Sequence, residues 1–136
     1  MGCVLGIDYG EKRIGVAVSD ELKMIAMPLL VHTRIKPGDD VVAIMDLCRE
    51  REVETILVGQ PLNMDGSSGA AVDKVDEFVA RLKEQTDLPI ELWDERMSSL
   101  SAERVLIEGN MSRRKRKGVV DKLAAQIILQ SYLDSL

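Results

Sequence analysis

Residues 4–20 read VLGIDYGEKRIGVAVSD, in which two apolar runs flank the polar segment GEKR. We expect two antiparallel strands here, because a connection this short favours a hairpin. With the two-residue period of a strand, the neighbours of Asp8 on its own face are Gly6 and Gly10. These neighbours have no side chains, so the sequence predicts open surface around a charge in the middle of a strand.

The register of this hairpin follows from its apolar residues. Leu5 and Ile7 are the core-facing residues of the first strand. They lie beside Val16 and Val18 only if the numbers of paired residues add to an odd value. The same register puts three small residues of the second strand on the face of Asp8, namely Gly15, Ala17 and Ser19. One face of the hairpin therefore consists of small residues around a single acid.

Length and composition indicate one soluble globular domain over residues 1–136. Hydrophobic residues make up 46% of the chain and charged residues 30%. No apolar run is long enough to span a membrane, and the first residues do not resemble a secretion signal. Cys3 and Cys48 both lie in apolar patterns, so we expect buried free thiols in a cytoplasmic protein. With His32 as the sole histidine, a zinc site or a serine–histidine–aspartate triad has few residues to form from.

The order of predicted elements indicates an α/β fold. A third strand over about Leu29–Thr33 completes a meander, and KPGDD then opens a helix with Asp39 or Asp40 as its cap. Helices alternate with the short apolar strands TILVGQP and IELWDE, and a last helix covers about Val119–Leu136. Strands reached through helices pair in parallel. We predict a mixed five-stranded sheet of order 3-2-1-4-5, with strand 2 antiparallel and helices on both faces.

Basic residues are concentrated in one segment of an acidic chain. The net charge is −5, yet SRRKRKG over residues 112–118 holds five consecutive cations, namely Arg113, Arg114, Lys115, Arg116 and Lys117. We expect a loop here. It either creates a local electrostatic field that binds phosphate or is a flexible segment in solvent.

Two further acids could lie near Asp8. Asp121 shares a helix face with Ala124 and Ala125, and these small side chains would let the helix approach the sheet closely. In LWDERMSS, Asp94 and Glu95 point to opposite faces, and Glu95 is the better candidate because its side chain is longer. Each acid also has a structural interpretation. Asp8 could form an ion pair with the cations of the turn, and Asp121 could interact with the helix dipole. The residues DER could form an ion pair at the surface.

A buried ionised acid is costly unless it is paired or bound to a metal. If Asp8, Glu95 and Asp121 converge, their repulsion requires a cation, and hard oxygen ligands suit Mg²⁺ or Mn²⁺. Such a site activates water and stabilises an oxyanion in phosphodiester hydrolysis. We therefore predict Asp8, Glu95 and Asp121 as metal ligands and catalytic residues.

The motifs GIDYGEKRIGVAVSD, VGQPLNMDGS, DERMSS and SRRKRKGVVDKLAAQIILQSYL occur in this order over nearly the whole chain. In this the sequence resembles the YqgF family, also called RuvX, of ribonuclease H-like proteins. The resemblance implies a ribonuclease H-like fold and a cytoplasmic nuclease that processes the 5′ end of pre-16S rRNA, or one that resolves Holliday junctions in branched DNA. It also maps the acidic positions of the family onto Asp8, Glu95 and Asp121. One departure is the exit of the fourth strand, VGQP, which lacks the acid common in this fold.

Several polar residues are candidates for binding the substrate backbone, namely Lys12, Arg13, Asn63, Arg96 and the five cations of residues 113–117. VGQPLNMDG contains a turn, in which Asn63 could donate to a phosphate and Asp65 is a reserve metal ligand. Aromatic residues make up 3% of the chain, so a base-stacking platform is not expected.

Two other functions remain open from sequence. The segment GIDYG also resembles the phosphate-binding hairpin of actin-like and sugar-kinase ATPases, which clamp a nucleotide between two such domains. A noncatalytic domain that binds structured RNA or branched DNA through its basic segment is the other alternative.

Overall fold

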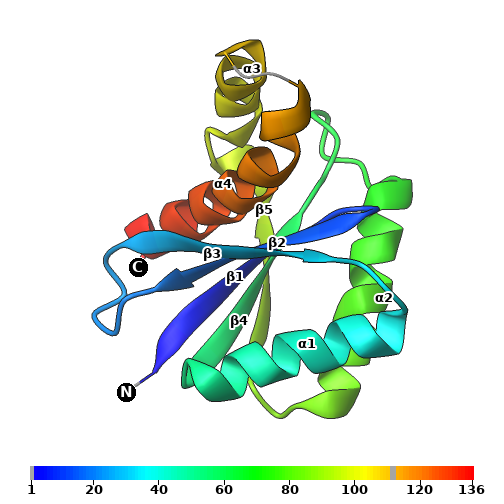
Figure 1. The fold of residues 1–136 in the computed structure, drawn as a ribbon, viewed down its shortest axis with the longest axis vertical. Coiled ribbons are helices and arrows are strands. Elements are labelled where there is room, and N and C mark those ends of the chain that lie inside the picture. Colours follow the sequence, from blue (N-terminus) through cyan, green and yellow to red (C-terminus); the bar gives the residue numbers. More distant parts are fainter. Residues whose placement is uncertain (1, 111–112) are drawn as a thin grey trace.

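The structure is a computed structural model that describes residues 2–110 and 113–136, with side chains described for 2–106, 109 and 120–136. Figure 1 shows the elements in chain order, which are β1 Cys3–Tyr9, β2 Arg13–Ser19, β3 Ala26–Thr33, α1 Pro37–Glu50, β4 Val53–Gln60, α2 Ala70–Gln85, β5 Ile90–Asp94, the 3₁₀ helix η1 Glu95–Met97, α3 Leu100–Asn110 and α4 Arg113–Asp134.

The five strands form one mixed sheet in the order β3-β2-β1-β4-β5. β2 pairs antiparallel with β1 and β3, whereas β4 pairs parallel with β1 and β5. The predicted fold class and strand order are therefore confirmed. Leu5 pairs with Val18 and Asp8 with Gly15, so the odd-sum register is confirmed as well.

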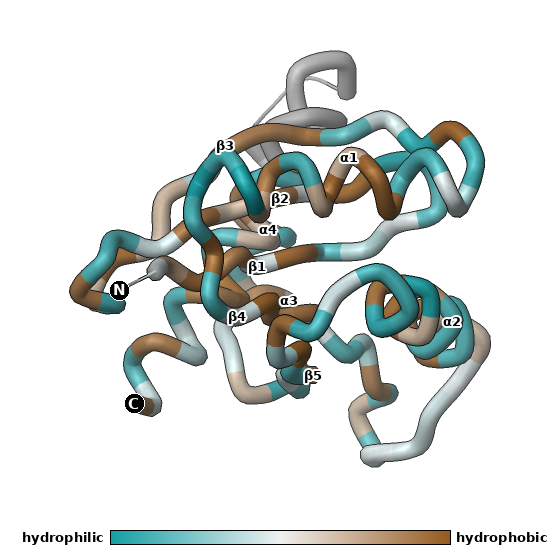
Figure 2. The backbone as a smooth tube through the Cα atoms, turned by 90° about the horizontal axis from the view of Figure 1, so that it is seen from below, coloured by the Kyte–Doolittle hydropathy of each residue, from teal (hydrophilic) through white to brown (hydrophobic). Residues whose placement is uncertain are grey.

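Helices lie on both faces of the sheet. α1 and α2 lie on one face, and α4 with α3 lies on the other (Figure 1). In Figure 2, hydrophobic and hydrophilic residues alternate along α1 and α2, as expected of helices with one apolar face. Beneath them, β1, β2 and β4 bury large side chains, including Ile7, Ile14, Val16 and Ile56.

The face under α4 is built differently. Gly6 and Gly15 leave room for the helix, because a Cβ atom on Gly6 would lie 2.8 Å from Cβ of Leu129. A Cβ atom on Gly15 would lie only 1.9 Å from the backbone oxygen of Asp121. Ala124 and Ala125 are buried at the same contact. Small residues on both partners therefore let α4 lie directly on the sheet.

Two local predictions were wrong. β3 begins at Ala26, so it is longer than predicted. α1 has Lys36 as its N-cap residue and no side-chain cap. Asp40 instead lies buried in the first turn, where Oδ1 accepts a hydrogen bond from the backbone N–H of Ile35 and contacts Nε2 of His32 at 2.8 Å.

The basic segment was also predicted wrongly. α4 begins at Arg113, so residues 113–117 have helical backbone rather than a loop. Asp121 consequently lies well inside α4, which removes the first-turn dipole explanation for this residue. The side chains of the five cations lie outside the described residues.

The two cysteines, Cys3 and Cys48, are buried and free, as predicted. Among the residues that the structure describes, no helix combines the length and apolar character needed to cross a membrane.

Candidate active site

A pocket of about 370 Å³ opens where the carboxyl end of β1 meets α2, α3, α4 and η1. It is lined by the acids Asp8, Glu11, Glu95 and Asp121, the cations Lys74 and Arg104, and by Tyr9, Gly10, Pro61, Ala70 and Ala71. The three acids predicted from sequence thus come from three distant segments and line one cavity.

Asp8 is buried within β1, with 8% of its surface exposed. Burial raises the pKa of its carboxyl group to about 6, which the positive charge of Arg104 opposes and the negative charge of Asp121 reinforces. The ion-pair partner of Asp8 is Arg104 of α3, whose Nη2 lies 3.4 Å from Oδ2. The structural interpretation of a pair with Lys12 or Arg13 of the turn is therefore not supported.

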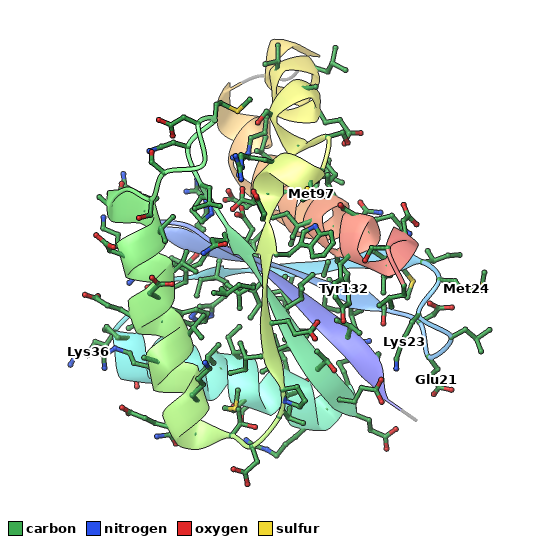
Figure 3. All side chains as sticks on the ribbon, turned by 180° about the vertical axis from the view of Figure 1, so that it is seen from behind. Glu21, Lys23, Met24, Lys36, Met97 and Tyr132 are labelled. Atoms are coloured by element: carbon green, nitrogen blue, oxygen red, sulfur yellow. The ribbon has the colours of Figure 1, made fainter. Side chains whose placement is uncertain are left out.

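Glu95 reaches the pocket from η1, immediately after β5. Its Oε2 atom would lie 3.1 Å from a Cβ atom on Gly59, so the missing side chain at Gly59 makes room for the carboxyl group. Burial raises the pKa of Glu95 to about 7, and the charge of Asp8 contributes in the same direction. Met97, the last residue of η1, lies beneath α3 at the end of β5 (Figure 3). β4 ends at Gln60 without an acid at its exit, and Glu95 follows the end of the neighbouring strand β5.

Asp94 has a different role from its neighbour Glu95. It accepts hydrogen bonds from the backbone N–H and the side chain of Arg96, and so caps η1. These bonds lower the pKa of Asp94. Asp94 is accordingly engaged outside the pocket, whereas Glu95 lines it.

Asp121 projects from α4 and is engaged by the hairpin turn. Nε of Arg13 donates to its Oδ2 atom at 2.5 Å, across 108 residues of sequence. Asp8 pairs with Arg104, Asp121 with Arg13 and Glu11 with Lys74, so cations of the protein balance most of the negative charge of this pocket.

The donor chemistry fits a divalent cation. Asp8 is buried and Glu95 is half-buried, and the charge of Asp8 adds to the burial that raises the pKa of Glu95, so a cation between the two carboxylates would relieve their repulsion. Their oxygen atoms are ligands that Mg²⁺ and Mn²⁺ prefer. Within residues 2–110 and 113–136, however, no three or more acidic, histidine or cysteine side chains come together closely enough to form a ready-made metal site.

The residues predicted to bind nucleic acid are only partly directed to this pocket. Lys12 lines a neighbouring pocket, and Arg13 and Arg96 pair with acids. Nδ2 of Asn63 donates to Oγ of Ser67, whose hydroxyl and backbone N–H also donate to the reserve ligand Asp65. Asn63 and Asp65 therefore form a self-contained turn, and Asp65 does not line the pocket.

Arg104 is the residue that sequence reasoning missed. It follows the buried residue Leu100 by four positions in α3. An arginine one turn after a buried leucine lies on the inner face of the helix. That spacing is the sequence signal that could have identified Arg104.

Sequence comparison places the chain in a known family. The sequence profile of the family described as "RuvX: Holliday junction resolvase" matches residues 2–135. The chain belongs to this family. The resemblance drawn from the sequence motifs is therefore confirmed, and membership makes the protein a hydrolase that acts on phosphodiester bonds.

Relatives agree with this assignment, and solved structures share the fold. The chain is 51% identical to a protein of Halothermothrix orenii, covering 96% of this chain and 94% of the relative, and 48% identical to one of Desulforamulus reducens, covering 97% and 96%. Both are named "Putative pre-16S rRNA nuclease". The fold is similar to that of Thermus thermophilus RuvC in complex with Holliday junction substrate, with a TM-score of 0.64, 16% identity and coverage of 99% and 95%. It is also similar to Fowlpox virus resolvase with its Holliday junction DNA, with a TM-score of 0.54, 10% identity and coverage of 98% and 97%.

Proposed function

We propose that the pocket around Asp8 is the active site of a metal-dependent nuclease that processes the 5′ end of pre-16S rRNA in the bacterial cytoplasm. The observation that carries this proposal is the position of the buried Asp8 and the half-buried Glu95 against small residues, where the charge of Asp8 adds to the burial that raises the pKa of Glu95. A protein that only needed to be stable would gain by replacing these acids with apolar side chains. The arrangement is expected where a cation completes the site.

Asp8 and Glu95 would hold Mg²⁺ or Mn²⁺, with Asp121 as the third acid of the same pocket. When bound, the ion supplies positive charge that lowers the pKa of water and stabilises the charge developing on the phosphate. Both carboxyl groups must lose their protons before they can bind it. Since burial raises both pKa values, activity is expected to rise as the pH increases from about 6 to 8.

The arginines of the pocket position these acids. Arg104 contacts Asp8 at 3.4 Å and lies at the pocket wall, where it can also attract a phosphate. The hydrogen bond from Arg13 holds the carboxyl group of Asp121, which projects from α4, in one orientation. The cations of residues 113–117, at the start of the helix that bears Asp121, would hold the substrate backbone.

The relatives' name supports pre-16S rRNA as the substrate, and the family description supports a Holliday junction as the alternative. Cleavage assays can separate the two. We expect the protein to cleave an RNA spanning the 5′ end of 16S rRNA at one site, and to leave a four-way DNA junction intact under the same conditions. Cleavage of the junction alone would favour the alternative.

Asp8→Asn tests the assignment of the site. The variant keeps the size of the side chain but removes the charge that binds the ion, so we expect cleavage to fall by about a thousandfold or more, several kcal/mol of transition-state stabilisation. Asp76→Asn, which changes an exposed acid of α2, is the matched control and should cleave as the parent does. Equal cleavage by the Asp8→Asn variant and the parent would show that the site is wrongly assigned.

A further inference from the structure

A second pocket, of about 470 Å³, adjoins the active-site pocket. Tyr9, Glu11 and Lys74 line both cavities, so the two share a wall formed by the end of β1 and the first turns of α2. Only this shared wall of residues therefore separates the two cavities, so a chain molecule bound in the first pocket can reach the second over it.

The second pocket is positively charged, although the whole chain carries −5. Four cations line it, namely Lys12, Arg34, Lys74 and Arg81, against the two acids Glu11 and Glu77. Only the pair of Lys74 with Glu11, at 3.0 Å and largely exposed, is an ion pair between these groups in the described part of the chain. A surplus of positive charge in a concave site favours an anionic ligand.

Arg34 is held rigidly at this site. Its Nη1 donates to the backbone oxygens of Gly10 at 3.2 Å and Glu11 at 2.9 Å, and its Nε donates to Asp40 at 3.4 Å. Its side chain is only 21% exposed. In the part of the chain that the structure describes, these bonds engage Nε and Nη1, which leaves the hydrogens of Nη2 for a ligand. A fixed guanidinium loses little conformational entropy when it binds a phosphate.

The aromatic floor of the pocket has no free face for a base. The rings of Tyr9 and Phe78 are stacked with centroids 4.4 Å apart, and the guanidinium of Arg34 lies 4.6 Å from the centroid of Tyr9. Because the stacked ring fills one face of Tyr9, the guanidinium must cover the other. Nucleotide binding through base stacking is therefore disfavoured, and recognition of the backbone phosphate is favoured.

We propose that this second pocket, lined by Lys12, Arg34, Lys74 and Arg81, binds the phosphodiester backbone of the substrate strand beside the bond to be cleaved. The inference rests on the proposed function, because it takes the first pocket as the place of cleavage. It adds a binding site for the flanking phosphates, in which Arg34, Lys74 and Arg81 fix the direction of the strand from α4 toward α2. Such contacts give affinity that is independent of base sequence.

Binding measurements test this inference. The probes are fluorescein-labelled RNA hairpins with a single-stranded 5′ extension, in two unrelated base sequences, measured by anisotropy in EDTA between 50 and 200 mM NaCl. Arg81→Gln and Lys12→Gln each remove one charge of the pocket. Lys83→Gln removes one exposed charge from the same helix, outside the pocket, and is the matched control for Arg81→Gln.

Each pocket variant should weaken binding of both hairpins by about the same factor and reduce the slope of log K against log salt by about 0.7 to 0.9. Lys83→Gln should change affinity less than about twofold. Arg81→Gln and Lys12→Gln variants that bind as Lys83→Gln does would overturn the proposal. Loss of binding to one hairpin alone would also overturn it, because a backbone contact does not read sequence.

These outcomes are separate from the test of the proposed function. If Asp8→Asn cleaves as the parent does while Arg81→Gln binds weakly, the catalytic proposal fails and the backbone site stands. If Asp8→Asn is inactive while the pocket variants bind normally, the catalytic proposal stands and the backbone site fails. Circular dichroism and thermal unfolding of each variant show whether a change in affinity reflects folding.

Discussion

The two faces of the sheet use opposite means of packing. Under α1 and α2, β1 and β2 present large apolar side chains such as Ile7 and Val16, both fully buried. Under α4, the same two strands present Gly6, Asp8 and Gly15, and the helix lies directly on the backbone. One strand thus contributes to a conventional core on one side and to the candidate active site on the other.

This difference indicates the role of the face with Gly6, Asp8 and Gly15, the small-residue face. Removing side chains from a sheet sacrifices hydrophobic stabilisation of about 25 cal/mol for each Å² of apolar surface. Here the sacrifice gives room for a close helix, for the buried carboxyl group of Asp8 and for the half-buried one of Glu95. The faces should therefore respond oppositely to substitution, since one depends on filled volume and the other on absent volume.

The largest expected effect is on the face of α1 and α2. Ile7→Ala removes a fully buried side chain and leaves a cavity, so the free energy of unfolding should fall by about 4 kcal/mol. Val42→Ala, at a position that is 57% exposed on α1, should change it by less than about 0.5 kcal/mol. Urea denaturation measures both. A loss below about 1 kcal/mol for Ile7→Ala would mean that this face is not tightly packed.

On the face of α4, adding atoms should be destabilising. The Cβ atom of a Gly15→Ala variant would overlap the backbone oxygen of Asp121, which can move only with α4, so we expect a loss of about 3 kcal/mol. Gly38→Ala in α1 is the control, because no atom lies within 4 Å of its new Cβ. That substitution should stabilise the protein by about 0.5 kcal/mol. Tolerance of alanine at residue 15 would contradict the close approach of α4.

The acid on this face should make stability depend on pH. The pKa of Asp8 is raised from 3.8 to about 6 in the folded protein, so its contribution to stability is complete below about pH 4 and is lost as the pH rises through 6. Asp8→Asn avoids this loss. In metal-free buffer the variant should exceed the parent by about 3 kcal/mol at pH 8 and match it near pH 4. A variant that is less stable than the parent at pH 8 would show that Asp8 is favourably paired.

The smallest effect concerns Arg104, whose charge opposes the upward shift of Asp8. Arg104→Met should raise the pKa of Asp8 further, by less than about one unit because the arginine is partly exposed. Arg104→Lys should restore most of the parent value. Carboxyl ¹³C shifts of Asp8 across a pH titration measure the change. An unchanged pKa in Arg104→Met would mean that the two groups do not interact in solution.

Local sequence patterns predicted most of the fold. Alternation in residues 4–20 indicated both the hairpin and its register, because a slip of one residue would turn Leu5 and Ile7 out of the core. The length of the glutamate side chain favoured Glu95 over Asp94, and the structure places Glu95 against Gly59 of β4, whose missing side chain leaves room for it. These predictions depended on backbone periodicity, which the sequence records directly.

The ion pairs could not be predicted in the same way. Asp8 pairs with Arg104 and Asp121 with Arg13, which depends on how α3 and α4 dock rather than on sequence distance. The basic residues 113–117 were expected to form a loop because they lack apolar periodicity. Arginine and lysine have good helix propensity, and the segment is helical. Helix propensity therefore accounts for the structure of this segment, for which hydrophobic periodicity gives no prediction.

The central claim is that the small-residue face exists to hold a divalent ion between the carboxyl groups of Asp8 and Glu95. Anomalous diffraction at the manganese edge from crystals soaked in Mn²⁺ at pH 8 tests it directly. We expect a peak within about 2.5 Å of oxygen atoms of both residues, absent from crystals of the Asp8→Asn variant. Manganese density only elsewhere on the protein, or a peak that persists in the variant, would contradict the account.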